Sequence, residues 1–298
     1  VPPTSPWNPS LAMLSLPPGL RYMLLSALGF ALMAACVKAV SGLGIPVLEI
    51  VAARAVVSLV ISYLDIKRKR LSVWGQNKPL LIARGAVGTL ALICVYFSVT
   101  RLPLAEAAIL QYTYPAFTAV IALWFLKERI QTATIICIVL SIAGLGVMLR
   151  PELSANAVLA LPGLSVMAAL LGALGSAVAY VLVRRLSQSE DTSVIIFYFP
   201  MIALPVALSL LGTDLVIPSG EALLLLLLVG LFTQVGQVGL TKAMAVEEAG
   251  KAAAYSYIQV VFSIILGALF FNELPTLWTW LGGGLIMLGA LNNSLRKR

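Results

Sequence analysis

Two stretches of this chain, 145 positions apart, follow one pattern. The first is AAILQYTYPAFTAVIALWFLKE (residues 107–128) and the second is AAAYSYIQVVFSIILGALFFNE (residues 252–273). The less common residues that match are Tyr112 with Tyr257, Phe117 with Phe262, Phe125 with Phe270, and Glu128 with Glu273. Alanine and leucine matches are frequent in apolar sequences, but the tyrosines and glutamates hold one register. The pattern therefore predicts a duplicated chain.

The composition around these stretches places the chain in a membrane. Its 298 residues are 60% hydrophobic and 11% charged, and the mean hydropathy is +1.01. A crossing helix takes about 20 residues, so the length supplies roughly ten crossings and leaves no room for a soluble catalytic domain. Unbroken apolar runs, which favour helices over an alternating barrel, lie at 22–41, 46–64, 79–100, 103–126, 130–149, 162–183, 193–212, 221–241, 252–271 and 276–295.

The basic residues predict the orientation of these crossings. The net charge is +8, which in a soluble protein would suggest nucleic acid, but the cations cluster between apolar runs. With a cytoplasmic N-terminus, the outer ends carry only Lys38, Arg101 and Arg150. The inner ends carry Arg21, Lys67, Arg68, Lys69, Arg70, Lys78, Arg84, Lys127, Arg129, Arg184, Arg185, Lys242, Lys251, Arg296, Lys297 and Arg298. The positive-inside rule then places both termini in the cytoplasm, and we expect no nucleic-acid partner.

The duplication and the crossings together predict the organisation of the chain. We expect a flexible tail at 1–18 and two five-helix repeats at 19–150 and 151–298. Under a shift of 146, Lys38 of the first run also falls on Arg184 of the sixth. Since five is odd, the second repeat sits upside down relative to the first, as in many secondary transporters. The predicted fold class is an all-α integral membrane protein with ten transmembrane helices in two inverted repeats.

Polar residues on corresponding runs predict a central cavity. Gln111, Tyr114 and Thr118 share one helical face, and adding 145 gives Ser256, Gln259 and Ser263. The third and eighth runs match less completely, because Leu92 interrupts the stripe. A single membrane glutamine often just bonds a neighbouring helix, but aligned stripes favour a shared lining near the midplane. The predicted substrate-binding residues are Thr89, Tyr96, Gln111, Tyr114, Thr118, Tyr180, Gln234, Gln237, Ser256 and Gln259.

Several residue types that other mechanisms need are missing from the sequence. Histidine is absent, Cys36, Cys94 and Cys137 stand singly, and no ATP-binding glycine loop occurs, so we expect no metal, cofactor or ATP hydrolysis. All acids lie near run ends, the deepest being Glu49 with Arg54 nearby, and we expect each of these two to meet another helix, a headgroup or a loop. A deep pathway carboxylate is typical of proton-coupled antiporters. Its absence favours facilitated diffusion.

Two further residues invite a structural expectation. Pro115 interrupts the fourth run, and its counterpart is Val260, so we expect any kink to be confined to the first copy. Lys242 lies near the inner end of the eighth run. It either contacts a substrate carboxylate or, the more ordinary role, snorkels to the membrane surface.

The sequence resembles the EamA-type branch of the drug/metabolite transporter superfamily. The resemblance rests on Pro115-Ala116-Phe117 running to Leu126-Lys127-Glu128-Arg129, on its second copy Val260-Val261-Phe262 running to Phe271-Asn272-Glu273-Leu274, and on Lys38 and Arg54. It implies a bacterial inner-membrane carrier that exports small metabolites by alternating access. The cavity implied is formed by runs one, three, four, six, eight and nine. Within the superfamily, the aromatic and neutral amino-acid exporters are most similar to its aromatic and amide lining.

Four other functions fit the sequence less well than amino-acid export. An uptake carrier for a nucleotide-like or vitamin solute needs cavity cations, and the mapped stripes contain none. A proton-coupled drug exporter needs a deep carboxylate, and a membrane-embedded enzyme needs paired acids or a metal set. The short loops leave little surface for a receptor. We expect a non-enzymatic, monomeric carrier whose partners are a small-molecule substrate and the lipid bilayer.

Overall fold

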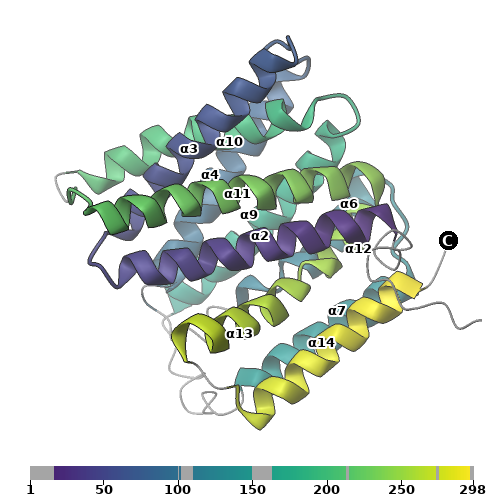
Figure 1. Cartoon of the computed structure of the whole chain (residues 1–298). Coiled ribbons are helices and arrows are strands. Elements are labelled where there is room, and N and C mark those ends of the chain that lie inside the picture. The colour runs from purple at the N-terminus through teal and green to yellow at the C-terminus, as the bar shows by residue number, and fades with distance from the viewer. Residues whose placement is uncertain are drawn as a thin grey trace, which may run out of the picture.

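The computed structural model describes residues 17–99, 101, 110–149, 163–212, 215–272 and 275–295, and every regular element in these ranges is a helix. The helices (Figure 1) are α2 (Pro18–Ser41), α3 (Val47–Arg68), α4 (Lys78–Val99), α6 (Tyr114–Phe125), α7 (Thr132–Leu149), α9 (Gly163–Leu186), α10 (Thr192–Leu211), α11 (Gly220–Val246), α12 (Ala249–Tyr255), α13 (Ile258–Phe271) and α14 (Leu277–Leu295). Seven spans among the described residues are long and apolar enough to cross a membrane, α12 and α13 together forming one of them. Two shorter apolar helices accompany them. The predicted all-α membrane class is confirmed.

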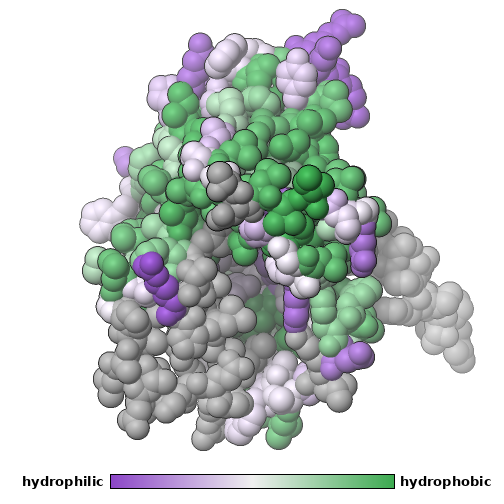
Figure 2. All heavy atoms as spheres, turned by 90° about the vertical axis from the view of Figure 1, so that its left-hand side faces the viewer, coloured by the Kyte–Doolittle hydropathy of each residue, from purple (hydrophilic) through white to green (hydrophobic). Residues whose placement is uncertain are grey.

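The surface of the bundle is suited to lipid. Large apolar side chains point outward, including Trp124, which is 81% exposed, and Leu269, which is 70% exposed. Figure 2 shows apolar residues over much of one face, with hydrophilic side chains gathered toward its edge. Because helices satisfy most of their backbone hydrogen bonds internally, such a surface can face hydrocarbon.

The helices pack in pairs that the repeat relates to one another. α2 lies along α11, as Figure 1 shows, and α4 lies along α9. The shift of 145 to 146 positions carries α2 onto α9 and α4 onto α11, so these two pairs are equivalent. In the same way α3 packs against its own counterpart α10, and α7 packs against α14. This exchange of equivalent contacts is what an inverted pair of repeats produces.

Small residues bring the paired helices into close contact. A Cβ atom added to Gly29 would lie 2.7 Å from the Gly236 amide nitrogen, and one added to Gly239 would lie 2.7 Å from the Ser26 nitrogen. Gly175 approaches Ala91 in the equivalent α4–α9 pair. These glycines therefore serve as packing surfaces, which agrees with the role expected for small residues in membrane helices.

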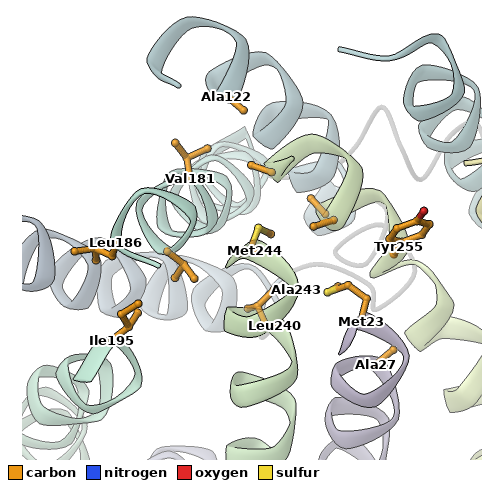
Figure 3. Close-up of a cluster of buried hydrophobic side chains, with 14 of the residues drawn as sticks. Met23, Ala27, Ala122, Val181, Leu186, Ile195, Leu240, Ala243, Met244 and Tyr255 are labelled. Atoms are coloured by element: carbon orange, nitrogen blue, oxygen red, sulfur yellow. The ribbon is translucent and has the colours of Figure 1, made fainter. Parts of the chain in front are cut away.

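One end of the bundle is closed by a large apolar cluster. Met23 of α2, Met244 of α11 and Tyr255 of α12 are all buried there (Figure 3). Leu186 and Ile195, where α9 ends and α10 begins, lie in the same cluster. Ten of the described helices contribute buried residues to this cluster, so it is a large shared core.

The two copies of the duplicated segment break within one residue of the same place. A turn at 112–113 precedes α6, and a turn at Ser256 and Tyr257 separates α12 from α13. The Tyr257 hydroxyl donates to the carbonyl oxygen of Tyr112 at 2.7 Å, and the two rings stack with centroids 5.9 Å apart. The Tyr114 hydroxyl donates to Ser256 Oγ. Each break thus supplies polar partners to the other.

The expectation that a kink would be confined to the proline-containing copy is wrong. The second copy has Val260 at the position of Pro115 and still breaks. There the Ser256 hydroxyl donates to the Ala253 carbonyl oxygen at 2.6 Å, which replaces a helical hydrogen bond. The break depends on these tertiary and side-chain bonds, and proline is only one way to favour it.

Candidate substrate cavity

A cavity of about 220 Å³ lies among α2, α4, α9, α10 and α11. Its polar lining residues come from three helices and from the segment before α6, and its apolar wall is mostly small or aromatic. The residues that line it are Phe30, Arg84, Gly88, Ala91, Leu92, Val95, Gln111, Ser176, Ala179, Tyr180, Val183, Phe199, Gln237 and Leu240. This is the size of a site for one small metabolite, below the range of about 300–1,000 Å³ typical of drug-sized ligands.

Arg84 is the only charged residue in this lining. Its side chain is buried, with 5% of the residue exposed, and its Nη2 donates to Gln237 Oε1 at 3.3 Å. The guanidinium also lies over the Phe199 ring, 4.8 Å from the centroid. Gly88 permits this approach, because a Cβ there would lie 2.9 Å from Phe199 and 3.2 Å from Arg84.

The sequence-based grouping of Arg84 with the inner loop cations is therefore wrong. The residue lies one and a half turns inside α4 and shares a helical face with Gly88, Ala91 and Val95. The signal was present in the sequence, since a cation one turn and more inside an apolar run has to be buried or to snorkel. The positive-inside rule assigns every cation to a loop end and so does not distinguish a buried arginine from an exposed one.

Two buried polar atoms in the cavity wall lack a hydrogen-bond partner. One is the donor Arg84 Nε and the other is the acceptor Gln111 Oε1. Gln111 is held by its other end, since its Nε2 donates to Ser176 Oγ at 3.3 Å and Ser176 donates to the Gly172 carbonyl oxygen. Buried polar groups are almost always paired in folded proteins. An unpaired donor and an unpaired acceptor in one cavity therefore suit a ligand that brings both an acceptor and a donor.

Aromatic rings form the remaining wall of the cavity. Tyr180 of α9 and Phe199 of α10 face it, together with Phe30 of α2. Behind Tyr180, Tyr114 packs edge-on with ring centroids 5.1 Å apart. Tyr114 itself is buried and bonded to Ser256, so these two residues support the wall without lining the cavity.

Three of the predicted site residues, Gln111, Tyr180 and Gln237, line the cavity. Gln234 lies elsewhere, between two serines of α3: Ser58 donates to its Oε1 at 2.6 Å, and its Nε2 donates to Ser62 at 2.9 Å. This is the ordinary interhelical role of a membrane glutamine.

The other predicted residues lie outside the lining. Thr89 and Thr118 each donate to the carbonyl oxygen four residues earlier in their own helix. Gln259 is half-buried on α13, away from the cavity lining. The side chain of Tyr96 falls outside the described residues.

Two other charged residues named from the sequence also lie away from the cavity. Lys242 is exposed and stands 5.7 Å from the Tyr22 ring centroid. Glu49 is buried at the start of α3 and accepts a hydrogen bond from the Val216 amide at 2.9 Å, so it meets a connecting segment as expected. Within the described ranges, no cluster of three histidine, cysteine or acidic residues is placed to hold a metal ion.

A bonded charge network joins four helix ends next to the apolar cluster. Arg184 Nε pairs with Glu128 Oε1 at 2.7 Å, and Arg184 Nη1 donates to the carbonyl oxygens of Met244 and Ala245 at 2.7 and 3.1 Å. The other carboxylate oxygen of Glu128 accepts from the Ala249 amide at 2.7 Å. We call these residues the charged end of the bundle. Glu128 thus braces neighbouring helices.

The backbone turns into this network through a left-handed residue. Lys127, which follows α6, has φ of 57°, and its repeat counterpart Asn272, which follows α13, has φ of 54°. Residues other than glycine rarely adopt this conformation, although asparagine does so more readily. The shared turn ends both helices at the same register and directs Glu128 toward Arg184.

Paired inverted helices around one internal polar cavity define a membrane transporter. The model of the EamA-like transporter family matches residues 17–150 and 163–295, so the chain belongs to this family. It is 33% identical to the pseudopaline exporter CntI of Pseudomonas aeruginosa, over 94% of this chain and 97% of that protein. It is 31% identical to human solute carrier family 35 member G1, over 94% of this chain and 79% of that protein. These relatives are transporters, not enzymes.

A solved structure shares the fold. One crystal structure superimposes with a TM-score of 0.78, at 20% sequence identity, and the match covers 96% of this chain and 97% of that one. At this identity the likeness concerns the fold alone.

Proposed function

We propose that this protein exports small zwitterionic metabolites, with aromatic and neutral amino acids as the leading class. The observation that carries the proposal is the pair of unsatisfied atoms in one cavity, Arg84 Nε and Gln111 Oε1. A carboxylate accepts from the guanidinium, and an ammonium donates to the glutamine oxygen. The sequence stripes contained no partner for the carboxylate, and Arg84 supplies one.

The rest of the lining suits the side chain of such a substrate. Tyr180, Phe199 and Phe30 offer ring faces and edges to an aromatic or aliphatic group. Gln237 holds the guanidinium through Nη2, and Nε keeps its hydrogen available for a ligand carboxylate. An uncharged side chain fits this wall better than a second charge, because the lining holds no other ionised group.

The proposed transport cycle is facilitated diffusion by alternating access. The cavity lining contains no carboxylate that could carry a coupling proton. We place the protein in a bacterial inner membrane as a monomer with both termini and the charged end facing the cytoplasm. The basic loops support this orientation, and the resemblance to an exporter supports the direction.

A second candidate is a carrier for a nucleotide-like anion. It needs a cation in the cavity, and Arg84 meets that need. The phosphate group itself offers mainly acceptors, so a nucleotide would have to place a sugar hydroxyl or a base N–H at Gln111 Oε1, whereas an amino acid carries its acceptor and its donor on one carbon atom. The unpaired acceptor therefore favours the zwitterion.

The test is flux in proteoliposomes, with labelled phenylalanine, leucine and a nucleoside monophosphate, with and without a pH gradient. We expect phenylalanine and leucine flux that ignores the gradient. Arg84→Gln and Gln111→Leu should each reduce it at least about tenfold, because each removes a hydrogen bond to a charged group. Lys242→Gln is the matched control, since it removes an exposed cation. Nucleotide flux without amino-acid flux would replace the proposal with the second candidate.

A further inference from the structure

A second arginine reaches the aromatic wall of the cavity from outside its lining. The Arg54 guanidinium of α3 lies 5.7 Å from the centroid of the Phe199 ring, and its Nη1 contacts Met33 Sδ at 3.9 Å. Arg84 lies over the same ring at 4.8 Å. One phenylalanine therefore contacts two guanidinium groups, of which only Arg84 lines the present cavity.

Neither guanidinium has a carboxylate partner among the described residues. Every ion pair there involves other cations, namely Arg68, Lys69, Arg184 and Lys251. Glu49, the acid on the same helix as Arg54, is bonded to the Val216 amide. Two like charges near one ring inside a membrane bundle are costly without counter-ions. Cation–π contacts with Phe199 offset part of that cost, and an anionic ligand would offset more.

The two arginines occupy opposite halves of the bundle. Arg54 lies in the first half of α3, and Arg84 lies in the first half of α4. Consecutive membrane helices run in opposite directions, so their first halves lie toward opposite membrane surfaces. Phe199 is the repeat counterpart of Arg54 under the shift of 145, and the two are in contact. Contact between repeat counterparts places them close to the axis that relates the two halves, which is where a substrate has to cross.

We propose that Arg54 forms a second carboxylate site, past Phe199 from the cavity, that receives the substrate from Arg84 during the crossing. The proposal rests on the proposed function, because it concerns the same carboxylate. Phe199 holds each guanidinium in place while its site is empty. With one guanidinium in each half of the path, the substrate carboxylate keeps a counter-charge while it crosses the midplane.

The test separates binding from translocation, with L-phenylalanine as the probe. Equilibrium binding is measured on purified protein in detergent, and flux is measured in proteoliposomes. We expect Arg84→Gln to lose both. Arg54→Gln should bind phenylalanine within about twofold of wild type but carry it at least about tenfold more slowly, since one charged hydrogen bond is missing from the path alone. Arg54→Lys, which keeps the charge, should recover most of the flux.

Two controls keep the outcomes distinct. Met33→Leu removes the sulfur contact of Arg54 without a change of charge and should leave flux intact. Lys242→Gln removes a cation away from the path. If Arg54→Gln weakens binding as much as Arg84→Gln does, the two arginines form a single site and the second carboxylate site is refuted. Unchanged flux in Arg54→Gln refutes it as well. If Arg84→Gln binds and transports normally, the proposed function itself fails, whatever Arg54 shows.

Discussion

Arg84 in the cavity and Arg184 at the charged end are both largely buried, yet their surroundings differ. Arg184, with 17% of its side chain exposed, bonds one carboxylate and two carbonyl oxygens at 2.7 to 3.1 Å. Arg84, less exposed, has one amide oxygen at 3.3 Å and an Nε with no partner. An arginine that bonds a carboxylate and two carbonyl oxygens holds helices together, whereas an arginine with an unpaired Nε keeps capacity for a ligand. The number of hydrogen-bond partners therefore distinguishes a structural arginine from a ligand-binding one better than the exposed fraction does.

The largest effect on stability is expected from Arg184→Gln. The change leaves Glu128 without its cation and removes the shorter side-chain hydrogen bonds to the carbonyl oxygens of Met244 and Ala245, which keep Ser187 and Gln188 as donors at 3.3 Å. Breaking one partner of a buried ion pair costs about 3 kcal/mol of the free energy of unfolding. Unfolding in detergent, followed by circular dichroism, measures it. Glu128→Gln is the matched variant, and the double variant should cost less than the sum of the two. Additive losses would mean that the pair itself contributes little.

Arg84→Met should behave in the opposite way. It removes a buried charge without a counter-ion among the described residues, so the free energy of unfolding should stay the same or rise by about 1 kcal/mol. Phenylalanine flux should disappear in the same protein. The same unfolding measurement serves as the check. A loss of unfolding free energy as large as that of Arg184→Gln would assign Arg84 a structural role, and the two arginines would then not differ in function.

A smaller effect is expected at the paired helix breaks, where the bonds are neutral. Tyr257→Phe removes the hydroxyl that donates to the Tyr112 carbonyl oxygen at 2.7 Å and leaves that oxygen unpaired. We expect a loss of about 1 kcal/mol in unfolding free energy. Tyr63→Phe on the exposed surface is the control and should change nothing. An equal change in both variants would show that the bond between the breaks is not what stabilises them.

The smallest effect concerns a partly exposed ion pair, Lys69 with Asp191, at 2.9 Å. Burial raises the pKa of the Asp191 carboxyl, but the Ser193 amide and the Lys69 ammonium outweigh it and lower the pKa below 3.8. The contribution is present above that value and is lost as the pH falls through the lowered pKa. Because the pair is partly exposed, only a few tenths of a kcal/mol should be lost. Asp191→Asn should flatten this acid limb of the stability profile, and an unchanged limb would contradict the assignment.

The membrane helices could be predicted because their signal is local. An apolar run of sufficient length has to span, and the predicted run at 193–212 differs from α10 by one residue at each end. The cavity residues were harder to predict. Gln234 and Gln237 are one turn apart on α11, yet one bonds α3 and the other faces the cavity. Their polar side chains marked both glutamines as candidates, but only the position of the neighbouring helices shows which one faces the cavity.

The sequence by itself determined that the chain lies in a membrane, that its helices are duplicated, and that Glu128 marks the end of a repeated helix. These features follow from hydropathy and register, which neighbouring residues along the chain carry. Tertiary structure alone decided that Arg84 faces a cavity, that Arg54 meets its own repeat counterpart, and that both helix breaks support each other. Whether a polar atom finds a partner depends on distances between helices far apart in the chain, and no pattern within one helix contains those distances.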